Sequence, residues 1–483
     1  MKCFAGLGFC LVFFGCGPHR IWESNSPDRM HRIEVWQDGQ RQFARMDGHD
    51  EPSYLAIGID GVSWSPDAAQ VAYPANTPAG WVVVAGGKLR GPWLGIGEIV
   101  WSPDGKQIAY SATEHRLWTV VRNSTRGNYY DAILQGSIAF SPDGTRLGYV
   151  VQDGRWIRAV VDEKPGPKFE GIGHLTFSAD SRHHGYVARR EGAAYVVTDG
   201  QSSSGYDAIA DLVMAPKGFR WAILARENGR WHVVSFDDKG PAFDAIASPV
   251  FSPDGRRMAY AAKRRDNAVV VVDGIESAAF DQILAGSVVF DSTGEHLAFS
   301  VRQGKLWRVV VDGRPGKEHA HVGEPHLAGN SIAYVARTGR YVRAVVDNVE
   351  GPEFDSIEDL TLTSDGLRHG YTAKKNQASF VVVDSMPQKF DVIIEDTFVF
   401  SSDGRHWACL IGDAHQEKFY ITVDGTLRIA VENAAWMTAL LPDFRRMNEF
   451  NVLRPKSALR HWIAAELEKA LMKPPTPLPS SRP

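Results

Sequence analysis

Histidines recur at matching places along this chain, and their imidazole nitrogens are common ligands of zinc. Three of them occupy the same position just after a short polar turn: His183, His296 and His406. Two more, His184 and His369, lie one residue later. A second group is closely spaced in sequence: His319, His321 and His326. Copies of one repeated position point away from a shared axis, so they need not converge on one ion. We therefore predict no metal site and no cofactor, and we interpret these side chains as solvated histidines.

Basic residues gather in short polar segments in the middle of the chain, where they far outnumber the acids. The candidate binding residues are Arg189, Arg190, Lys263, Arg264, Arg265, Arg337, Arg340, Lys374 and Lys375. The whole chain carries a net charge of −4, which gives no reason to expect nucleic-acid binding. A local basic surface would steer an anionic partner: an acidic protein, an anionic glycan or lipid headgroups. Ordinary solvated turns remain the alternative.

Motifs of catalysis are missing from the sequence. It contains no Gly-x-Ser-x-Gly elbow, no His-Glu-x-x-His, no Cys-x-x-Cys and no phosphate loop. No local pairing with histidine or lysine suggests an activated thiolate at Cys409, so we interpret it as a small buried residue. We predict a protein that is not an enzyme. The alternative is a hydrolase or lyase acting on glycans, which would bring two carboxylates from different repeats within ~10 Å.

The elements that position these residues come from a repeat that fills most of the chain. Ser65 and Ser401 mark its first and tenth copies, so the mean period is about 37 residues. An apolar strand A ends in Phe or Trp, Ser-Pro-Asp-Gly makes a turn, and an alternating strand B follows. A Val-rich strand C ends in Asp-Gly, and we assign segments such as Phe243 to Ile246 to strand D. The predicted fold is all-β, a β-propeller of four-stranded blades.

The core (F/W)-S-P-D-G-x-x-(I/L/M)-A-Y, as in WSPDGKQIAY from Trp101 and FSPDGRRMAY from Phe251, resembles the WD-repeat-like propeller units of TolB-type bacterial proteins. The resemblance covers about residues 61 to 425. It implies a propeller fold and says little of function, because such relatives include scaffolds, binding proteins and peptidase propellers.

The chain ends suggest how the repeats are completed. Residues 32–57 are expected to supply strands B, C and D of a blade whose strand A comes from residues 434–441. Ten full repeats and this split blade would make eleven blades, more than the usual four to eight. One large ring and two tandem propellers, of five and six blades, both remain open.

The N-terminal sixteen residues resemble a bacterial lipoprotein signal, with Lys2, an apolar stretch and Gly15 before Cys16. This resemblance implies lipidation at Cys16 and export to the periplasm or cell envelope. A plain cleaved signal and an uncleaved anchor are alternatives. We expect residues 1–16 to be this signal, 17–30 a tether, 31–442 the propeller repeats, and 443–483 a helix with a Pro-rich tail. The predicted function is a membrane-anchored scaffold for unknown protein partners or an anionic envelope component.

Overall fold

The computed structural model describes residues 17–27, 31–235, 238–413, 418–430, 460, 463, 464 and 467. Within these residues the strands form eleven antiparallel sheets, each with the strand order A-B-C-D. The chain divides into two compact units, Met1–Ile209 and Ala210–Pro483. Sheets 1 to 5 belong to unit 1 and sheets 6 to 11 to unit 2, with the boundary inside the first strand of sheet 6. The fold is all-β and propeller-like.

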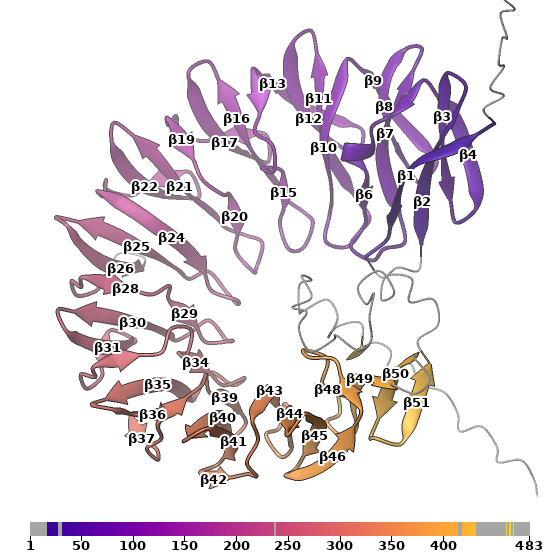
Figure 1. Ribbon diagram of the computed structural model, residues 1–483. Coiled ribbons are helices and arrows are strands. Elements are labelled where there is room, and N and C mark those ends of the chain that lie inside the picture. The colour runs from indigo at the N-terminus through magenta and orange to yellow at the C-terminus, as the bar shows by residue number, and fades with distance from the viewer. Residues whose placement is uncertain are drawn as a thin grey trace, which may run out of the picture. The chain divides into compact units, whose positions relative to one another are not determined.

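Unit 1 contains five sheets (Figure 1). Sheet 1 is β1 (His19–Asn25), β2 (Arg32–Asp38), β3 (Arg41–Met46) and β4 (His49–Tyr54). Sheet 2 is β5 (Ala56–Ile57), the 3-10 turn η1 (Ile59–Gly61), β6 (Ser63–Trp64), β7 (Val71–Thr77), β8 (Gly80–Ala85) and β9 (Lys88–Trp93). Sheet 3 is β10 (Gly95–Trp101), β11 (Ile108–Glu114), β12 (Leu117–Arg122) and β13 (Thr125–Tyr130). Sheet 4 is β14 (Ala132–Ile133), β15 (Ala139–Phe140), β16 (Leu147–Asp153), β17 (Trp156–Val161) and β18 (Lys164–Pro165). Sheet 5 is β19 (Gly171–Ile172), β20 (Thr176–Phe177), β21 (His184–Arg190), β22 (Ala193–Thr198) and β23 (Gln201–Ser202).

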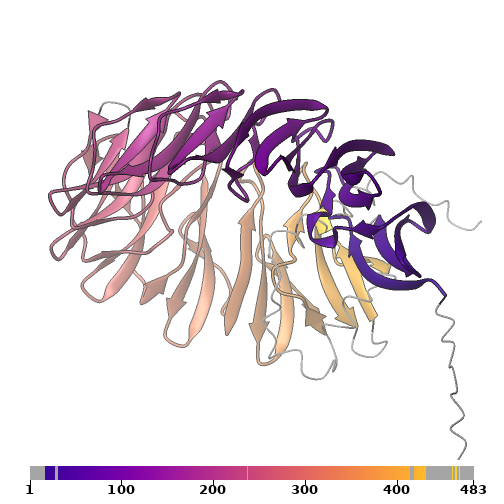
Figure 2. The same ribbon diagram turned by 90° about the horizontal axis from the view of Figure 1, so that it is seen from above.

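Unit 2 contains six sheets, which stand beside one another in the view from above (Figure 2). Sheet 6 is β24 (Ala208–Met214), β25 (Trp221–Glu227), β26 (Arg230–Ser235) and β27 (Asp238–Lys239). Sheet 7 is β28 (Ala245–Ile246), β29 (Val250–Phe251), β30 (Met258–Arg264), β31 (Asn267–Val272) and β32 (Ile275–Glu276). Sheet 8 is β33 (Gln282–Ile283), β34 (Val289–Phe290), β35 (Leu297–Gln303), β36 (Leu306–Val311) and β37 (Arg314–Pro315). Sheet 9 is β38 (His321–Val322), β39 (His326–Ala328), β40 (Ser331–Thr338), β41 (Tyr341–Val346) and β42 (Val349–Glu350). Sheet 10 is β43 (Ser356–Leu362), β44 (His369–Lys375), β45 (Ala378–Val383) and β46 (Met386–Phe390). Sheet 11 is β47 (Val392–Ile393), β48 (Val399–Phe400), β49 (Trp407–Asp413), β50 (Lys418–Val423) and β51 (Leu427–Ala430).

The assignment of the Phe-Asp-x-Ile segment to strand D is corrected by the register. Phe243 exchanges backbone hydrogen bonds with Trp231 on strand C of sheet 6. The next residue, Asp244, donates its N–H to the carbonyl of Lys263 in sheet 7, and Ala245 and Ile246 form β28 of that sheet. The phenylalanine therefore ends one sheet and the aspartate begins the next. Because the segment is continuously extended, its sequence does not mark where the pairing partner changes.

The split blade predicted from the two chain ends is wrong. Strand A of sheet 1 is β1, which pairs with β2, and sheet 11 is completed by its own strands β47 to β51. Residues 19–25 therefore belong to the first sheet, although we interpreted the segment 17–30 as a tether. The segment 434–441 lies outside the described residues. Of the predicted C-terminal helix, only Arg460, Ile463, Ala464 and Leu467 are described; their backbone is helical, but no bounded helix is described there.

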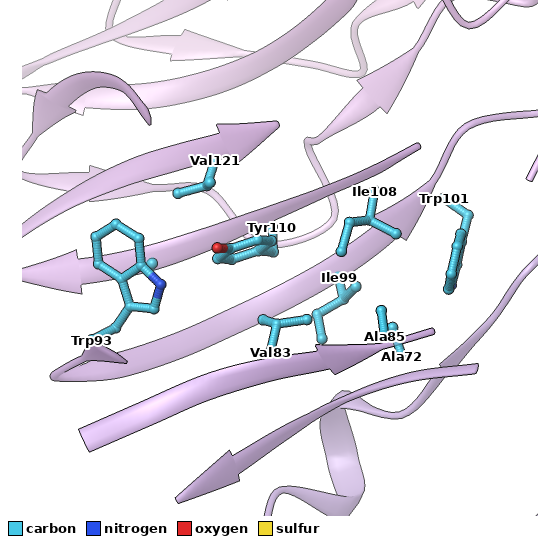
Figure 3. Packing of buried hydrophobic residues seen from close by; sticks show 10 residues of the cluster. Ala72, Val83, Ala85, Trp93, Ile99, Trp101, Ile108, Tyr110 and Val121 are labelled. Carbon is cyan, nitrogen blue, oxygen red and sulfur yellow. The ribbon is translucent and has the colours of Figure 1, made fainter. Parts of the chain in front are cut away.

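Within each unit, consecutive sheets pack face to face through apolar side chains of strands A, B and C. Between sheets 2 and 3, Val83 and Ala85 of β8 contact a cluster that includes Ile99, Ile108 and Tyr110 (Figure 3). Tyr110 is 1% exposed, and its ring lies edge-on to Trp93 with the ring centroids 6.4 Å apart. A four-stranded sheet has two apolar faces here, so each sheet needs a neighbour on both sides to exclude water.

The Ser-Pro-Asp-Gly turn between strands A and B closes its own hydrogen bonds. In sheet 3 the Ser102 hydroxyl donates to Asp104 Oδ1 (2.6 Å), and Ser102 Oγ accepts the N–H of Gln107 (2.9 Å). Gly105 has φ +68°, and a Cβ there would lie 3.2 Å from Asp67 Oδ1 in the preceding sheet. Glycine takes this left-handed backbone at the least cost, although Ala68 and Ser181 occupy the same turn position with φ 61° and 63°. The turn fixes the spacing between successive sheets.

Candidate functional site

The predicted basic residues lie at the end of the sheets that carries the B–C turns, called the B–C end below. In unit 2 the penultimate residue of strand B is basic in five successive sheets. These residues are Arg226, Lys263, Arg302, Arg337 and Lys374. Lys263 and Arg337 pair with the first residues of β28 and β38. Arg226, Lys263 and Arg337 are exposed, whereas Arg302 and Lys374 are half-buried. Arg189 occupies the same position in sheet 5 of unit 1.

Several of the nine predicted side chains have partners that reduce their availability. Arg264 forms an ion pair with Glu276 (2.8 Å) and lies 4.5 Å over the ring of Phe243. Lys374 pairs with Glu395 (2.7 Å). Arg190 stacks over Tyr195 at 5.4 Å, and Arg340 stacks over Tyr341 at 4.5 Å. Within the described part of the chain, Arg189, Lys263, Arg265, Arg337 and Lys375 have no acidic side-chain partner.

Aspartates from outside the B–C turns also lie at the B–C end, in addition to the few acids of the turns themselves. They are the acids of the Phe-Asp segment, and their side chains accept backbone N–H groups of the B–C turn in their own sheet. Asp244 Oδ2 accepts the N–H of Arg265 (2.5 Å), and Asp355 Oδ2 accepts that of Asn376 (2.7 Å). Asp281 does the same for Gly304 (2.6 Å). The B–C end is therefore a mosaic in which exposed cations alternate with turn-capping carboxylates.

The aspartates of the opposite end, which carries the A–B and C–D turns, have structural partners. In the A–B turns the serine hydroxyl bond and a backbone N–H hold the pKa of Asp104, Asp254 and Asp403 below its ordinary value. The same bonds, with further hydrogen bonds from Thr145, lower the pKa of Asp143 to about 2. These carboxylates are stabilised in the ionised form by the hydrogen bonds of their own turns.

The repeated histidines turn out to belong to these turns. His296 Nδ1 lies 2.7 Å from Asp312 Oδ2, and His183 and His406 make the same contact with Asp199 and Asp424 (2.6 Å each). In other sheets the position is arginine. Arg257 Nε donates to Asp273 (3.0 Å), and its Nη1 donates to the carbonyl of Glu295 in the next sheet (2.7 Å).

These contacts explain the histidine spacing without a metal. Among the described residues, no group of three or more His, Cys, Asp or Glu side chains is placed to hold a metal ion. His319 takes the place of the phenylalanine in sheet 9 and is 5% exposed, with its ring edge-on to Tyr334 at 5.9 Å. Cys409 is fully buried, as expected from the sequence, and burial raises the pKa of its thiol.

An acidic pair in unit 2, formed by Asp359 of β43 and by Asp396 in the turn between β47 and β48, was missed by sequence reasoning. Asp359, on β43 of sheet 10, has a fully buried side chain that contacts Arg460 Nη2. The same nitrogen lies 3.7 Å from Asp396 Oδ1 of sheet 11. Burial raises the pKa of Asp359, and the Arg460 guanidinium opposes that rise. Arg460 is 101 residues away in sequence, so no local signal points to this contact.

Two carboxylates from neighbouring sheets thus meet, which was the arrangement expected of a glycan-cleaving enzyme. Their surroundings differ from those of such a site. The Asp359 side chain has no exposed surface, and both carboxylates contact one guanidinium. A general acid must reach its substrate within hydrogen-bond distance. This pair therefore serves to hold Arg460.

The predicted lipidation residue Cys16 and the signal 1–16 lie outside the described residues. No helix in the described ranges is long and apolar enough to cross a membrane.

No family model matches the chain, and no curated protein matches it. Among solved structures, the chain is similar to a eukaryotic initiation factor, with 10% identity, coverage of 76% of this chain and 94% of that chain, and a TM-score of 0.35. It is similar to TolB from Acinetobacter baumannii, with 15% identity, coverage of 50% and 73%, and a TM-score of 0.22. It is similar to the Dos1 propeller, with 13% identity, coverage of 57% and 89%, and a TM-score of 0.27. At these identities the likeness concerns the fold alone, and no family is assigned.

Proposed function

We propose that this protein is a non-enzymatic scaffold that binds an acidic polypeptide through the B–C end of unit 2. The observation that carries the proposal is the single register position that is basic in five successive sheets. Turns are polar in any protein, but solvation alone does not require one sign of charge at one position of strand B. Repeated sheets place these cations in a row, and a row of like charges attracts an extended anionic partner.

The mosaic of charges favours a polypeptide over a uniformly anionic membrane. Asp244, Asp281 and Asp355 stand between the cations and are committed to their turns. A continuous anionic surface would lie against these carboxylates, and the repulsion between like charges at short range would weaken its binding. A polypeptide with spaced acidic side chains can meet Lys263 and Arg337 while avoiding them.

The first test measures binding of a fluorescent peptide that carries glutamate at every third residue. With Lys263→Glu and Arg337→Glu combined, we expect the affinity at low salt to fall about 10–30-fold, because two attractions become repulsions. Raising the salt to ~0.5 M should weaken binding to the native protein as screening shortens the range of the field.

The matched control changes the same charge at the opposite end. Arg256 and Arg405 are 87% and 82% exposed on the A–B turns of unit 2. Arg256→Glu with Arg405→Glu should alter the affinity less than threefold. Equal losses in both double variants would show that only net charge matters. Binding to phosphatidylglycerol vesicles without binding to the peptide would overturn the choice of a polypeptide partner.

We also propose that the chain is exported and anchored by a lipid on Cys16, on the strength of the lipoprotein-like Gly15-Cys16 sequence. A lipidated cysteine buries acyl chains in the bilayer, whereas serine cannot accept the thioether-linked lipid. After expression of the full chain in a Gram-negative host, the native protein should sediment with membranes. Cys16→Ser should shift most of it to a form without lipid or to an unprocessed precursor. A native mature protein that carries no added acyl mass would refute lipidation.

A further inference from the structure

The residue that leads into strand A occupies one position, called the entry position below, which is acidic in most sheets and leucine in two. It donates its backbone N–H to the carbonyl of the penultimate residue of strand B. In sheets 2 and 3 of unit 1 this bond is made by Leu55 to Asn76 (2.8 Å) and by Leu94 to Thr113 (3.0 Å). The register therefore places both leucines at the B–C end. In five other sheets the residue that makes this bond is an acid: Asp131, Glu170, Asp244, Asp281 and Asp355.

The two leucines belong to an apolar surface at the B–C end of unit 1. Leu94 is 68% exposed and Leu55 is 44% exposed. Leu117, which begins strand C of sheet 3 beside the B–C turn, is 39% exposed. The B–C turn of sheet 2, residues 77–80, carries no charged residue. Single exposed leucines are ordinary, but exposed leucines at one position of two adjacent sheets, where other sheets have an acid, indicate a surface that contacts an apolar partner.

Arginines flank this apolar surface. Arg116 is exposed in the B–C turn of sheet 3. Arg155 is exposed in the B–C turn of sheet 4, and its guanidinium lies 4.4 Å from the centroid of the Trp156 ring. The acid that ends strand B of sheet 3 is engaged, because Glu114 accepts a hydrogen bond from the Tyr129 hydroxyl (2.5 Å). Leucine, tryptophan and arginine together suit the boundary between lipid headgroups and acyl chains.

The lipid anchor proposed at Cys16 would reach the same end of unit 1. β1 is strand A of sheet 1, and its first residue, His19, pairs with Gln37 beside the turn between β2 and β3. β1 therefore starts at the B–C end. Two residues, Gly17 and Pro18, separate it from Cys16 in sequence, a span of about 11 Å at full extension. A lipid on Cys16 would hold this end against the bilayer, and such a short tether makes even weak contacts with lipid populated.

We propose that the B–C end of unit 1 lies on the surface of the bilayer that holds the anchor. Leu55 and Leu94 enter the acyl boundary, and Arg116 lies at the lipid phosphates. This inference rests on the proposed lipid anchor and names the lipid surface as the partner of this end. Removing the exposed leucines from water is favourable, whereas an acid at the entry position would be repelled by anionic headgroups.

The test measures how deeply a fluorescent dye enters the membrane. The dye NBD is attached at Leu94→Cys or, as a matched control, at Leu89→Cys. Leu89 is 57% exposed but lies beside the C–D turn, at the opposite end of the sheets. Cys409 is fully buried, so it does not take the dye. The full chain, processed in a Gram-negative host, is added to vesicles of phosphatidylcholine and phosphatidylglycerol that contain spin-labelled lipid. We expect the dye at Leu94→Cys to be quenched about threefold more than the dye at Leu89→Cys.

A double variant restores the acid that other sheets carry at the entry position. With NBD at Leu117→Cys as the reporter, Leu55→Asp combined with Leu94→Asp should reduce the quenching about threefold, because two apolar contacts become repulsions. Urea unfolding checks that this variant is folded. Leu89→Asp is the matched control and should leave the quenching at Leu117→Cys unchanged.

The mass of the purified protein reports the anchor separately from the membrane face. If acyl mass is present and the dyes at Leu94→Cys and Leu89→Cys are quenched equally, the face is overturned while the anchor stands. If acyl mass is absent, the anchor fails. The same two dyes in a chain with Cys3→Ser, Cys10→Ser and Cys16→Ser then decide the face alone, and equal quenching overturns it. A blue shift of the Leu94→Cys dye with protein concentration in the absence of vesicles would overturn lipid as the partner in favour of a second copy of the chain.

Discussion

Replacing Arg460 with leucine is expected to lower the free energy of unfolding by about 2–4 kcal/mol at pH 7. The Asp359 side chain is fully buried and contacts the Arg460 guanidinium, which is 40% exposed. Without it, the described residues leave the Asp359 carboxylate backbone donors such as the N–H of Thr397 (3.2 Å). A buried carboxylate that loses its counter-charge is costly, and the partial exposure of Arg460 places the loss below that of a fully buried pair. Urea unfolding measures the difference.

The loss should depend on pH with a definite sign. Burial raises the pKa of Asp359 above its ordinary value, so ionisation costs folding free energy. This cost is absent below about pH 4, where the unfolded chain is also protonated, and it grows as the pH rises through the folded pKa. Removing Arg460 raises that pKa further. The gap between native and Arg460→Leu proteins should therefore be smaller at pH 5 than at pH 7.

A double variant controls for lost packing. Asp359→Asn removes the charge and keeps the shape of the side chain. In that background Arg460→Leu should cost less than half as much, because no carboxylate is left unpaired. If Arg460→Leu costs the same in the Asp359→Asn background as in the native chain, the ion pair does not carry the effect.

Replacing Phe354 with alanine is expected to cost about 3–5 kcal/mol. Phe354 is the phenylalanine of a Phe-Asp segment in sheet 9 and is 3% exposed. Its ring centroid lies 6.1 Å from that of Tyr371 and 5.8 Å from that of Phe380, both in sheet 10. The alanine would leave a cavity between two sheets that the surrounding strands cannot close. Urea unfolding followed by tryptophan fluorescence measures the loss.

Val349 provides the matched control for this prediction. It begins β42, on the same segment as Phe354, but it is 71% exposed. Val349→Ala should change the free energy of unfolding by less than about 0.5 kcal/mol, as expected of a surface substitution. A loss from Phe354→Ala no larger than that of Val349→Ala would mean that the phenylalanine does not bind the two sheets together.

The four-strand unit could be predicted because its signals are local. Ser-Pro-Asp-Gly closes its turn with bonds inside a few residues, and Asp-Gly supplies the left-handed backbone of a tight turn, as at Asp273 and Gly274 (φ 50° and 84°), so composition alone marks the turns. The first strand of sheet 1 could not be predicted from the sequence. None of the residues of β1 is buried, so the segment lacks the apolar alternation that marks the other strands. Its identity as a strand comes from pairing with β2, which is a tertiary property.

The candidate sites were predictable to a smaller extent. Charge and spacing identified the basic side chains, since strand B repeats in register. The acidic partners of these side chains could not be predicted from the sequence. Arg264, for example, pairs with Glu276 only because strands B, C and D lie side by side in the sheet. The short turn at Gly329 was visible as a break in the sequence pattern. A cleft between sheets 8 and 9 could not be predicted, because His296 of the preceding sheet also lines it. Contacts between sheets are set by neighbours about 37 residues away.

The bridging arginines give the array a direction. Arg146, Arg257 and Arg368 each hold a turn of their own sheet and a carbonyl of the following one. At sheet 11 the face made by Ala408, Leu410, Ile421 and Val423 is covered instead by Ile463 and Leu467. Unit 2 thus behaves as a one-dimensional chain of nearest-neighbour couplings with a terminal cap. In such a chain, loss of the cap lets unfolding start at the last sheet and spread backwards. It should pause at sheet 9, because Ser331 of sheet 9 and His296 of sheet 8 stand where sheets 6, 7 and 10 have the bridging arginine.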